Sequence, residues 1–386
     1  MKLHHHTRAF EQVLAAYDGQ LPLHRFLVNY FRQNKQMGSS DRRWASRYIY
    51  SYFRLGRALT NRPVLERLAV ADFLCNDNMS LIAQSLMPDF AEQVGLSLDA
   101  KLDLVTARFP DFALADIFSF KNKRSEGVDN ADFLKSFLIQ PNLFIRLIAE
   151  HRNVLMQRLS ENAIPFKVLS TDTVALPNGT KLEQIFDASW YQIQDYSSQR
   201  TADFFKPVAY EYWWDCCAAS GGKSLLLHKL EPRVQLLVSD RRESSLGNLK
   251  ERFELYGIKS YQKKVMDLTE DNTALLHHYE FDGILLDAPC SGSGTWGRTP
   301  EMLYFFDEKK VEDYIALQKK IAQRVVKYLK KGKPLIYMTC SVFAKENEDI
   351  LKFLVSECGL ILEDSKLIVG YQDRADNMFV ARLIKL

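Results

Sequence analysis

The sequence predicts a doubly wound α/β domain with a mostly parallel sheet, preceded by a small α/β module and an all-helical region. In the second half of the chain, short apolar runs alternate with helical patterns, which is typical of parallel β-α-β units. Acidic and thiol side chains follow several of these runs, where open α/β sheets place their ligands. The 386 residues suffice for two or three domains with full cores.

The composition is that of an ordinary globular protein, with 47% hydrophobic and 26% charged residues. A net charge of +3 permits an anionic partner without demanding one. We find no signal peptide and no membrane-spanning apolar run, and therefore expect a cytoplasmic protein. The six cysteines lack zinc-type spacing, so we expect no metal site and no disulfide framework. The run His4-His5-His6 fits a metal-binding tract, a tag remnant or a frayed terminus, and we expect the frayed terminus.

Residues 1–125 are predicted to be all-helical, with apolar residues sharing helical faces at 10–14 and 23–31. A long helix is predicted to start near Ser39-Ser40-Asp41. One of its faces interleaves tyrosines with Arg42, Arg43, Arg47, Arg54 and Arg57. This face fits either a solvated surface or an RNA-backbone surface, because guanidinium groups pair with phosphates and stack on bases. The polar stretch 121–130 is the best linker candidate.

Residues 131–198 are predicted to form the small α/β module, with strands at 143–148 and 165–169 and a helix at 151–161. A hairpin turn is predicted at Pro177-Asn178-Gly179, since Asn-Gly supplies positive φ values. The module is a second candidate for RNA-backbone contacts because it carries Arg146, Arg152, Arg158 and Lys167.

Residues 199–386 are predicted to form the main sheet. Its strands are expected at 210–215, 235–240, 261–266, 281–287 and 334–340. Helices are expected at 222–230, 244–256, 272–278, 308–329 and 345–357. A last strand at 378–384 is expected to close one edge of the sheet.

The turn after the first of these strands has the composition of a ligand-binding loop: Asp215-Cys216-Cys217-Ala218-Ala219-Ser220-Gly221-Gly222-Lys223. Small residues and paired glycines let the backbone approach a ligand closely, and the next helix offers free N–H groups. The loop matches neither GxGxxG nor a P-loop.

Acidic residues end four successive strands: Asp215, Asp240, Asp267 and Asp287. Asp240 is placed to accept the hydroxyls of a ribose, and Asp267 to meet an adenine amino group. Each acid taken singly also fits an N-cap of the following helix. Together they suit a cationic nucleoside without phosphate, and therefore predict S-adenosylmethionine.

Two cysteines follow predicted strands, Cys290 in Asp287-Ala288-Pro289-Cys290-Ser291-Gly292 and Cys340 in Thr339-Cys340-Ser341. Two such thiols in a reduced protein are hard to explain by packing alone. The residues themselves do not tell which thiol would be a nucleophile.

These motifs resemble those of the RNA (cytosine-5)-methyltransferases of the Fmu/Sun/Nop (RsmB-like) type. The similar segments are 194–199, 217–223, 287–292, 339–341, 346–348 and 376–385. The resemblance covers roughly residue 131 to the C-terminus, and residues 1–125 more weakly resemble a NusB-like RNA-binding domain. Ser220 departs from the family pattern, which usually has proline there. Trp296-Gly297 is also less basic than that loop usually is.

The resemblance implies a Rossmann-like class I methyltransferase domain at 199–386, after a helical domain at 1–125 and an RRM-like module at 131–198. It implies Cys340 as nucleophile, Cys290 as an aid to product release and Asp287 as the residue that holds the cytosine. The cofactor would be S-adenosylmethionine, bound by Cys217, Ala218, Ala219, Ser220, Gly221, Gly222, Lys223, Asp240, Asp267 and Asp287.

The expected partner is RNA, with ribosomal RNA favoured over transfer RNA, and we predict phosphate contacts for Arg298 and Arg146. We expect a monomer that binds neither DNA nor membranes. A DNA cytosine methyltransferase would leave Cys340 without a task. The alternatives are a transfer-RNA methyltransferase and a non-catalytic RNA-binding or ribosome-assembly factor with the same fold.

Overall fold

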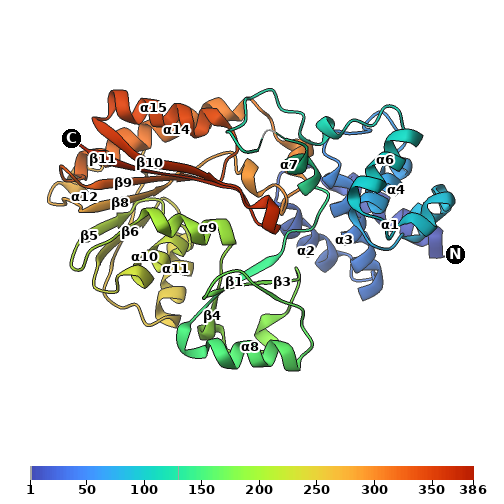
Figure 1. Cartoon of the computed structure of the whole chain (residues 1–386), viewed down its shortest axis with the longest axis horizontal. Coiled ribbons are helices and arrows are strands. Elements are labelled where there is room, and N and C mark those ends of the chain that lie inside the picture. Colours follow the sequence, from blue (N-terminus) through green and yellow to red (C-terminus); the bar gives the residue numbers. More distant parts are fainter. Residues whose placement is uncertain (1, 129) are drawn as a thin grey trace. The chain divides into compact units, whose positions relative to one another are not determined.

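The computed structural model describes residues 2–128 and 130–386, which form two compact units. The first unit contains residues 2–121, 130–140 and 295–308. The second contains Asn122–Val128, Pro141–Gly294 and Lys309–Leu386, including both sheets (Figure 1). None of the helices described is long and apolar enough to cross a membrane.

The first unit is helical, as predicted. Its core holds large side chains such as Phe10, Tyr48 and Phe53, which are fully buried. Its helices are α1 (Lys2–Ala16), α2 (Leu23–Gln33), α3 (Ser39–Arg54), α4 (Val64–Cys75), α5 (Leu81–Leu86), α6 (Leu98–Arg108), α7 (Ala131–Ser136) and α13 (Met302–Phe305), with 3-10 helices η1 (Pro88–Gln93) and η2 (Leu114–Phe118).

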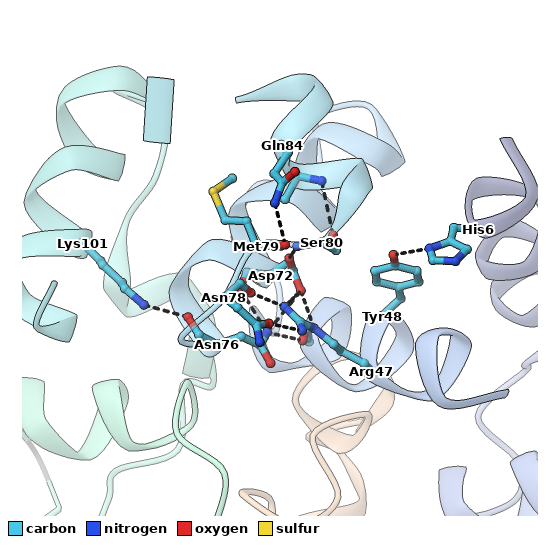
Figure 2. Close-up of polar contacts among 12 residues, drawn as sticks. His6, Arg47, Tyr48, Asp72, Asn76, Asn78, Met79, Ser80, Gln84 and Lys101 are labelled. Carbon is cyan, nitrogen blue, oxygen red and sulfur yellow. Dashed lines mark hydrogen bonds and ion pairs between the residues drawn. The ribbon is translucent and has the colours of Figure 1, made fainter. Parts of the chain in front are cut away.

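Two arginines of the predicted α3 face hold this unit together. Arg47 Nε donates to the buried carboxylate of Asp72 at 2.8 Å, and the Ser80 backbone N–H donates to the same group at 2.8 Å (Figure 2). Arg54 is buried and donates to the Phe137 carbonyl at 2.7 Å. These side chains are occupied by internal partners, so this face offers RNA fewer arginines than the sequence suggested.

The histidine run lies within α1, so the prediction of a frayed terminus is wrong. His6 is buried, and its Nδ1 lies 3.0 Å from the Tyr48 hydroxyl (Figure 2). His6 also packs against Trp44, with ring centroids 5.2 Å apart. Packing against α3 therefore orders the first turns of α1.

The small sheet of the second unit has the order β2-β3-β1-β4 and is antiparallel throughout. Its strands are β1 (Leu143–Leu147), β2 (Lys167–Val168), β3 (Thr173–Leu176) and β4 (Tyr191–Ile193), and α8 (Arg152–Glu161) packs on its apolar face. The predicted turn at Pro177-Asn178-Gly179 forms, with φ of +83° at Gly179 and the Thr180 N–H donating to the Pro177 carbonyl at 3.3 Å, but it is not the turn of a hairpin. The strands β2 and β3 pair around residues 169–172 instead, and the predicted turn leads into η4 (Leu182–Gln184).

The main sheet has the order β10-β11-β9-β8-β5-β6-β7. Its strands are β5 (Tyr212–Asp215), β6 (Gln235–Asp240), β7 (Gln262–Val265), β8 (Gly283–Asp287), β9 (Pro334–Thr339), β10 (Leu360–Ile368) and β11 (Met378–Lys385). Strands β5 to β9 are parallel, and β11 runs antiparallel to both β9 and β10. The last strand was expected at an edge, but it lies between β9 and the unpredicted edge strand β10.

Helices cover both faces of the main sheet (Figure 1). Alternating strand residues face opposite sides, so Trp213 packs with α10 and α11 whereas Trp214 packs with α12, α14 and α15. The helices are α9 (Tyr196–Arg200), α10 (Gly222–Leu230), α11 (Glu243–Leu255), α12 (Thr273–Leu276), α14 (Lys310–Val325) and α15 (Glu348–Glu357). This arrangement confirms the predicted doubly wound fold.

The middle of the predicted linker is bound to the second unit. The Ser125 N–H donates to the Val342 carbonyl at 2.8 Å, and the Ala344 N–H donates to the Lys123 carbonyl at 2.9 Å. The buried Ser125 hydroxyl accepts from Asn347 Nδ2 at 2.9 Å. Residues 122–128 therefore lie along the segment that follows Cys340.

Candidate active site

A cavity of about 530 Å³ lies at the carboxyl ends of the parallel strands in the second unit. Because the carboxyl ends of parallel strands meet at one edge of a sheet, residues distant in sequence converge there. The lining residues that the sequence predicted as functional are Cys217, Ala219, Asp240, Asp267, Asp287, Cys290 and Cys340.

The loop between β5 and α10 follows a tight, partly left-handed path, with φ of +46° at Ala219 and +82° at Gly221. The Gly221 N–H donates to the Ala218 carbonyl at 2.7 Å, which closes the turn. A Cβ atom at Gly221 would lie 2.9 Å from Leu249 Cγ, so only glycine fits without displacement.

Ser220, the departure from the family pattern, is held by a side chain of α11. Arg252 NH1 donates to the Ser220 carbonyl at 2.9 Å and lies 3.2 Å from its hydroxyl. The loop therefore has a polar clamp at the position where the family usually has the stiffness of proline.

Asp240 and Asp267 line the cavity and fix the backbone around it. Asp240 Oδ2 accepts from the Ala219 N–H at 3.0 Å, which ties the end of β6 to the loop after β5. Asp267 Oδ1 accepts from the backbone N–H and the hydroxyl of Thr269 at 2.8 and 2.7 Å. These bonds, the backbone one first, lower the pKa of Asp267, which keeps it anionic.

Asp215 does not line this cavity, which corrects the picture of four equivalent strand-end acids. It is fully buried and accepts from the Ser224 hydroxyl at 2.6 Å, within the first turn of α10. Burial raises the pKa of Asp215 to about 7. Its contact ties the end of β5 to the side chain of Ser224 in α10, whereas the N-cap position of that helix is Gly221.

Asp287 ends β8 with a cation beside it. Lys223 is buried, its Nζ lies 3.7 Å from Asp287 Oδ2, and it donates to the Ser198 hydroxyl at 2.5 Å. Asp287 itself keeps a third of its side chain exposed (33%) and faces the cavity. Lys223 thus forms an ion pair with Asp287 without lining the cavity itself.

The two thiols meet in the cavity, with Cys290 Sγ and Cys340 Sγ 3.4 Å apart. The contact follows from the sheet, because β8 and β9 are adjacent parallel strands and each cysteine lies just beyond one of them. The hydrogen bond with Cys340, reinforced by burial, raises the pKa of Cys290 well above its usual value. Cys290 is therefore held as a neutral thiol.

The buried carboxylate of Glu346, for which the sequence predicted no role, connects the two loops that carry Cys290 and Cys340. Glu346 Oε2 accepts from the hydroxyls of Ser291 and Ser341, each at 2.5 Å, and Oε1 accepts from the Ser291 N–H at 2.8 Å. Gln318 Nε2 adds a fourth bond at 3.2 Å. The motif Glu346-Asn347-Glu348 drew attention to this residue in the sequence. Only the folded structure shows that its side chain bonds to both cysteine loops.

The rest of the lining escaped sequence reasoning. Arg241 and Arg242 follow Asp240 directly, and this adjacency was an available signal. The apolar lining residues resemble any core positions in sequence and carried no signal. They include Met266, Leu268, Leu317 and Ile321.

The two predicted RNA contacts lie outside this cavity. Arg146 lies on β1 and is 2% exposed. Arg298 belongs to the first unit, where it is half-buried and its backbone N–H donates to the Thr295 carbonyl at 2.8 Å. Its neighbour Trp296 is buried among Phe118, Phe120 and Phe306, which explains why that loop is apolar.

Relatives of known name share this part of the chain. The sequence model of the family described as 16S rRNA methyltransferase RsmB/F matches residues 202–383. Ribosomal RNA small subunit methyltransferase B of Pectobacterium atrosepticum is 30% identical over 262 residues, covering 64% of this chain and 60% of that protein. The protein of that name from Shewanella oneidensis is 29% identical over 234 residues, covering 56% and 53%. The chain thus spans less than two thirds of the length of these curated relatives.

Solved structures show the same fold. The crystal structure of PH0851 has a TM-score of 0.71 at 20% identity and covers 99% of this chain and 98% of its own. NSun6 from Pyrococcus horikoshii, solved with SFG, has a TM-score of 0.58 at 18% identity and covers 67% and 95%. The family match at 202–383 contains the ligand-type loop, the strand-end acids and both cysteine loops. Through these residues the chain is similar to the RsmB/F methyltransferase family over residues 202–383.

Proposed function

We propose that this protein is an S-adenosylmethionine-dependent methyltransferase that modifies carbon 5 of a cytosine in RNA, with ribosomal RNA as substrate. The observation that carries the proposal is the pair of thiols 3.4 Å apart in a cavity that also contains strand-end acids. The names of the curated relatives, ribosomal RNA small subunit methyltransferases, support the choice of RNA.

The cavity suits S-adenosylmethionine in size and chemistry. Its volume of about 530 Å³ lies in the usual range for small-molecule sites, roughly 300–1,000 Å³. Asp240 and Asp267 would meet the ribose and the adenine amino group, and Met266, Leu268 and Ile321 offer apolar surface to the base. Cys217, Ala218, Ala219, Ser220, Gly221 and Gly222 would form the loop under the cofactor. When bound, S-adenosylmethionine supplies the methyl group.

The two cysteines have different roles in the proposed covalent mechanism. Carbon 5 of cytosine is a poor nucleophile, but addition of a thiolate to carbon 6 makes carbon 5 electron-rich. After methylation, removal of the carbon 5 proton breaks the sulfur–carbon bond and releases the thiol. We assign the attack to Cys340 because the family resemblance places the nucleophile in the Thr339-Cys340-Ser341 motif. Cys290 then assists release of the methylated product.

Asp287 would hold the cytosine while the ring is attacked. Its carboxylate is partly exposed to the cavity and fixed by Lys223 at 3.7 Å. A carboxylate so placed can hydrogen-bond or protonate the ring nitrogen as the adduct forms. The target base must be unpaired or flipped out, because a stacked base is inaccessible to these groups.

The remaining chain would bind the RNA. We propose the helical domain at 1–125 and the small module at 131–198 as RNA-binding parts in front of the methyltransferase domain at 199–386. Arg298 would contact a phosphate from the first unit, and Arg146 is considered below. We expect a smaller contribution from the α3 face, because Arg47 and Arg54 are bonded to internal partners.

The decisive experiment compares wild type, Cys340→Ala, Cys290→Ala and Cys358→Ala, incubated with methyl-labelled S-adenosylmethionine and total RNA from cells lacking the enzyme. Cys358 does not line the cavity and serves as the matched control. We expect transfer by wild type and Cys358→Ala, none by Cys340→Ala, and an SDS-stable protein–RNA adduct with Cys290→Ala. Transfer by Cys340→Ala would reverse or remove the assigned roles.

The same assay separates the alternatives. Label in transfer RNA rather than ribosomal RNA would change the substrate but keep the chemistry. If wild type labels no RNA yet binds it, the hypothesis of a non-catalytic assembly factor replaces this proposal. Nuclease digestion and chromatography of the labelled nucleoside would identify 5-methylcytosine.

A further inference from the structure

A second cavity, of about 370 Å³, lies between the small sheet and α10 in the second unit. It shares no lining residue with the thiol cavity. Its walls come from β1, the β2–β3 turn, β3, α9, η6 (Thr201–Phe204) and α10. The residues that matter here are Arg146, Asp172, Thr173, Gln199, Arg200 and Lys229.

One face of the small sheet is polar but buried along this cavity. Arg146 pairs across the sheet with Thr173 on β3 and Gln192 on β4, and all three side chains are buried. Thr173 donates to Gln199 Oε1 at 2.6 Å. The other face of the same strands carries the apolar core against α8. A buried polar row of this kind needs partners for each of its groups.

Arg146 lacks the partner that its charge requires. Its guanidinium donates to the neutral Gln192 Oε1, whereas its Nε has no acceptor among the described residues. Burial lowers the pKa of Arg146 to about 10, so the group remains a cation at neutral pH. A buried cation without an anionic partner strongly destabilises a folded protein.

The surroundings increase this positive charge. The nearby Arg252 acts on Arg146 as a like charge. At the cavity, Lys229 is exposed and pairs with Asp172, and Arg200 lies over the Tyr196 ring with its guanidinium carbon 5.6 Å from the centroid. Two carboxylates line the cavity: Asp172 pairs with Lys229, and neither Asp172 nor Asp203 forms an ion pair with Arg146 in the described part of the chain.

We propose that this cavity is a binding site for a phosphate group, with Arg146 at its base and Lys229 and Arg200 around it. A guanidinium offers parallel N–H donors to two oxygens of a phosphate, and an anion there would compensate the buried charge. The identification of this phosphate as one of the RNA backbone rests on the function proposed above. The phosphate chemistry itself rests on the cavity alone.

The first test is thermal unfolding of the full chain in phosphate and in chloride at equal ionic strength. Phosphate at ten times its dissociation constant should raise the folding equilibrium constant of wild type about eleven-fold. Phosphate also strengthens burial in general, so the signal is the difference between variants. Arg146→Met should lose the specific increase, and Arg233→Met, an exposed arginine paired with Glu231, should keep it.

The difference in stability between Arg146→Met and wild type in chloride distinguishes a ligand-binding arginine from a structural one. If the buried charge of Arg146 is compensated only by a bound phosphate, Arg146→Met should be as stable as wild type or more stable in chloride, where no phosphate is present. A large loss of stability in both salts, or an unchanged phosphate effect, would overturn the proposal. Should Arg146→Met fail to fold, Lys229→Ala provides the test, because a weaker phosphate effect is then expected from a change at an exposed position.

The second test measures the affinity for a single-stranded ribosomal RNA fragment at several salt concentrations. Loss of one phosphate contact should reduce the slope of log K against log salt by about 0.7 in Arg146→Met and leave Arg233→Met unchanged. A lost phosphate effect with an unchanged slope would keep the oxyanion site but reject RNA as its source. Methyl transfer assayed on the same proteins tests the proposed function separately, because either result can fail alone.

Discussion

Gly221 offers a sharp test of how the loop beneath the proposed cofactor is built. The substitution Gly221→Ala introduces two separable costs. The first is conformational, because φ is +82° and an L-residue in this region costs about 1–2 kcal/mol. The second is steric, because the new Cβ would lie 2.9 Å from Leu249 Cγ and 3.0 Å from Phe253 Cε1.

Leu249 and Phe253 are fully buried on α11, so neither can move away without disturbing the core. Overpacking of this kind costs about 1–3 kcal/mol, which brings the expected loss for Gly221→Ala to about 2–5 kcal/mol. Gly359→Ala is the matched control, since its φ is +64° but no atom lies within 4 Å of the added Cβ. The control should lose only the conformational part, about 1–2 kcal/mol.

Guanidinium unfolding of both variants gives these losses directly, provided that the slopes with denaturant match that of wild type. Equal losses at the two glycines would refute the packing argument, and no loss at Gly221 would refute the argument from φ. Titration calorimetry with S-adenosylmethionine adds a functional result. We expect Gly221→Ala to bind at least about ten-fold more weakly, equivalent to about 1.4 kcal/mol, because the Ala219 N–H that bonds Asp240 shifts with the loop.

Two further predictions concern buried acids. Glu346→Leu removes the acceptor of four hydrogen bonds and should cost about 2–4 kcal/mol in denaturant unfolding, whereas the isosteric Glu346→Gln should cost under about 1 kcal/mol; equal costs would reject the network. Asp215 has a folded pKa raised to about 7, so its stabilising effect is complete below its unfolded pKa and is lost as pH rises through the folded pKa. Asp215→Asn should therefore gain about 2–3 kcal/mol relative to wild type between pH 5 and pH 8, and a difference independent of pH would contradict the assignment.

The fold was largely predictable because the main sheet repeats a simple pattern of apolar run and amphipathic helix. Strand β6 and helix α10 have the bounds that the sequence predicted. Strand β10 was missed because most of its side chains are exposed, so it has no apolar run, and its existence depends on pairing with β11. The Asn178-Gly179 turn forms but does not join two adjacent strands, since local propensity cannot tell whether the following segment pairs with the strand before the turn.

The site was predictable where chemistry stands next to a strand end, as with Asp240, Asp267 and both thiols. It was not predictable where burial decides the role. Asp215 has the same sequence context as Asp287, but the one is sealed beneath α10 and the other faces the cavity. Arg146 has the same composition signal as an exposed arginine, although pairing with β3 and β4 places it inside the unit.

The thiol pair is best understood as a property of the sheet rather than of either cysteine. Asp287 is in register with Met338, and the Ala288 N–H donates to the Met338 carbonyl at 2.8 Å, so the two strands end side by side. The Gly294 N–H then donates to the Cys340 carbonyl at 2.8 Å, which closes the first loop onto the second.

Glu346 connects both loops by accepting hydrogen bonds from Ser291 and Ser341, the serines that follow the two cysteines. Asn347, its neighbour, donates to the Ser341 carbonyl at 3.0 Å and to the Ser125 hydroxyl at 2.9 Å. A slip of one residue between β8 and β9 would turn every side chain to the opposite face and separate the thiols. The distance between the sulfur atoms therefore depends on Glu346 and Asn347, which do not line the cavity, and for this reason we expect Glu346→Leu to reduce methyl transfer as well as stability.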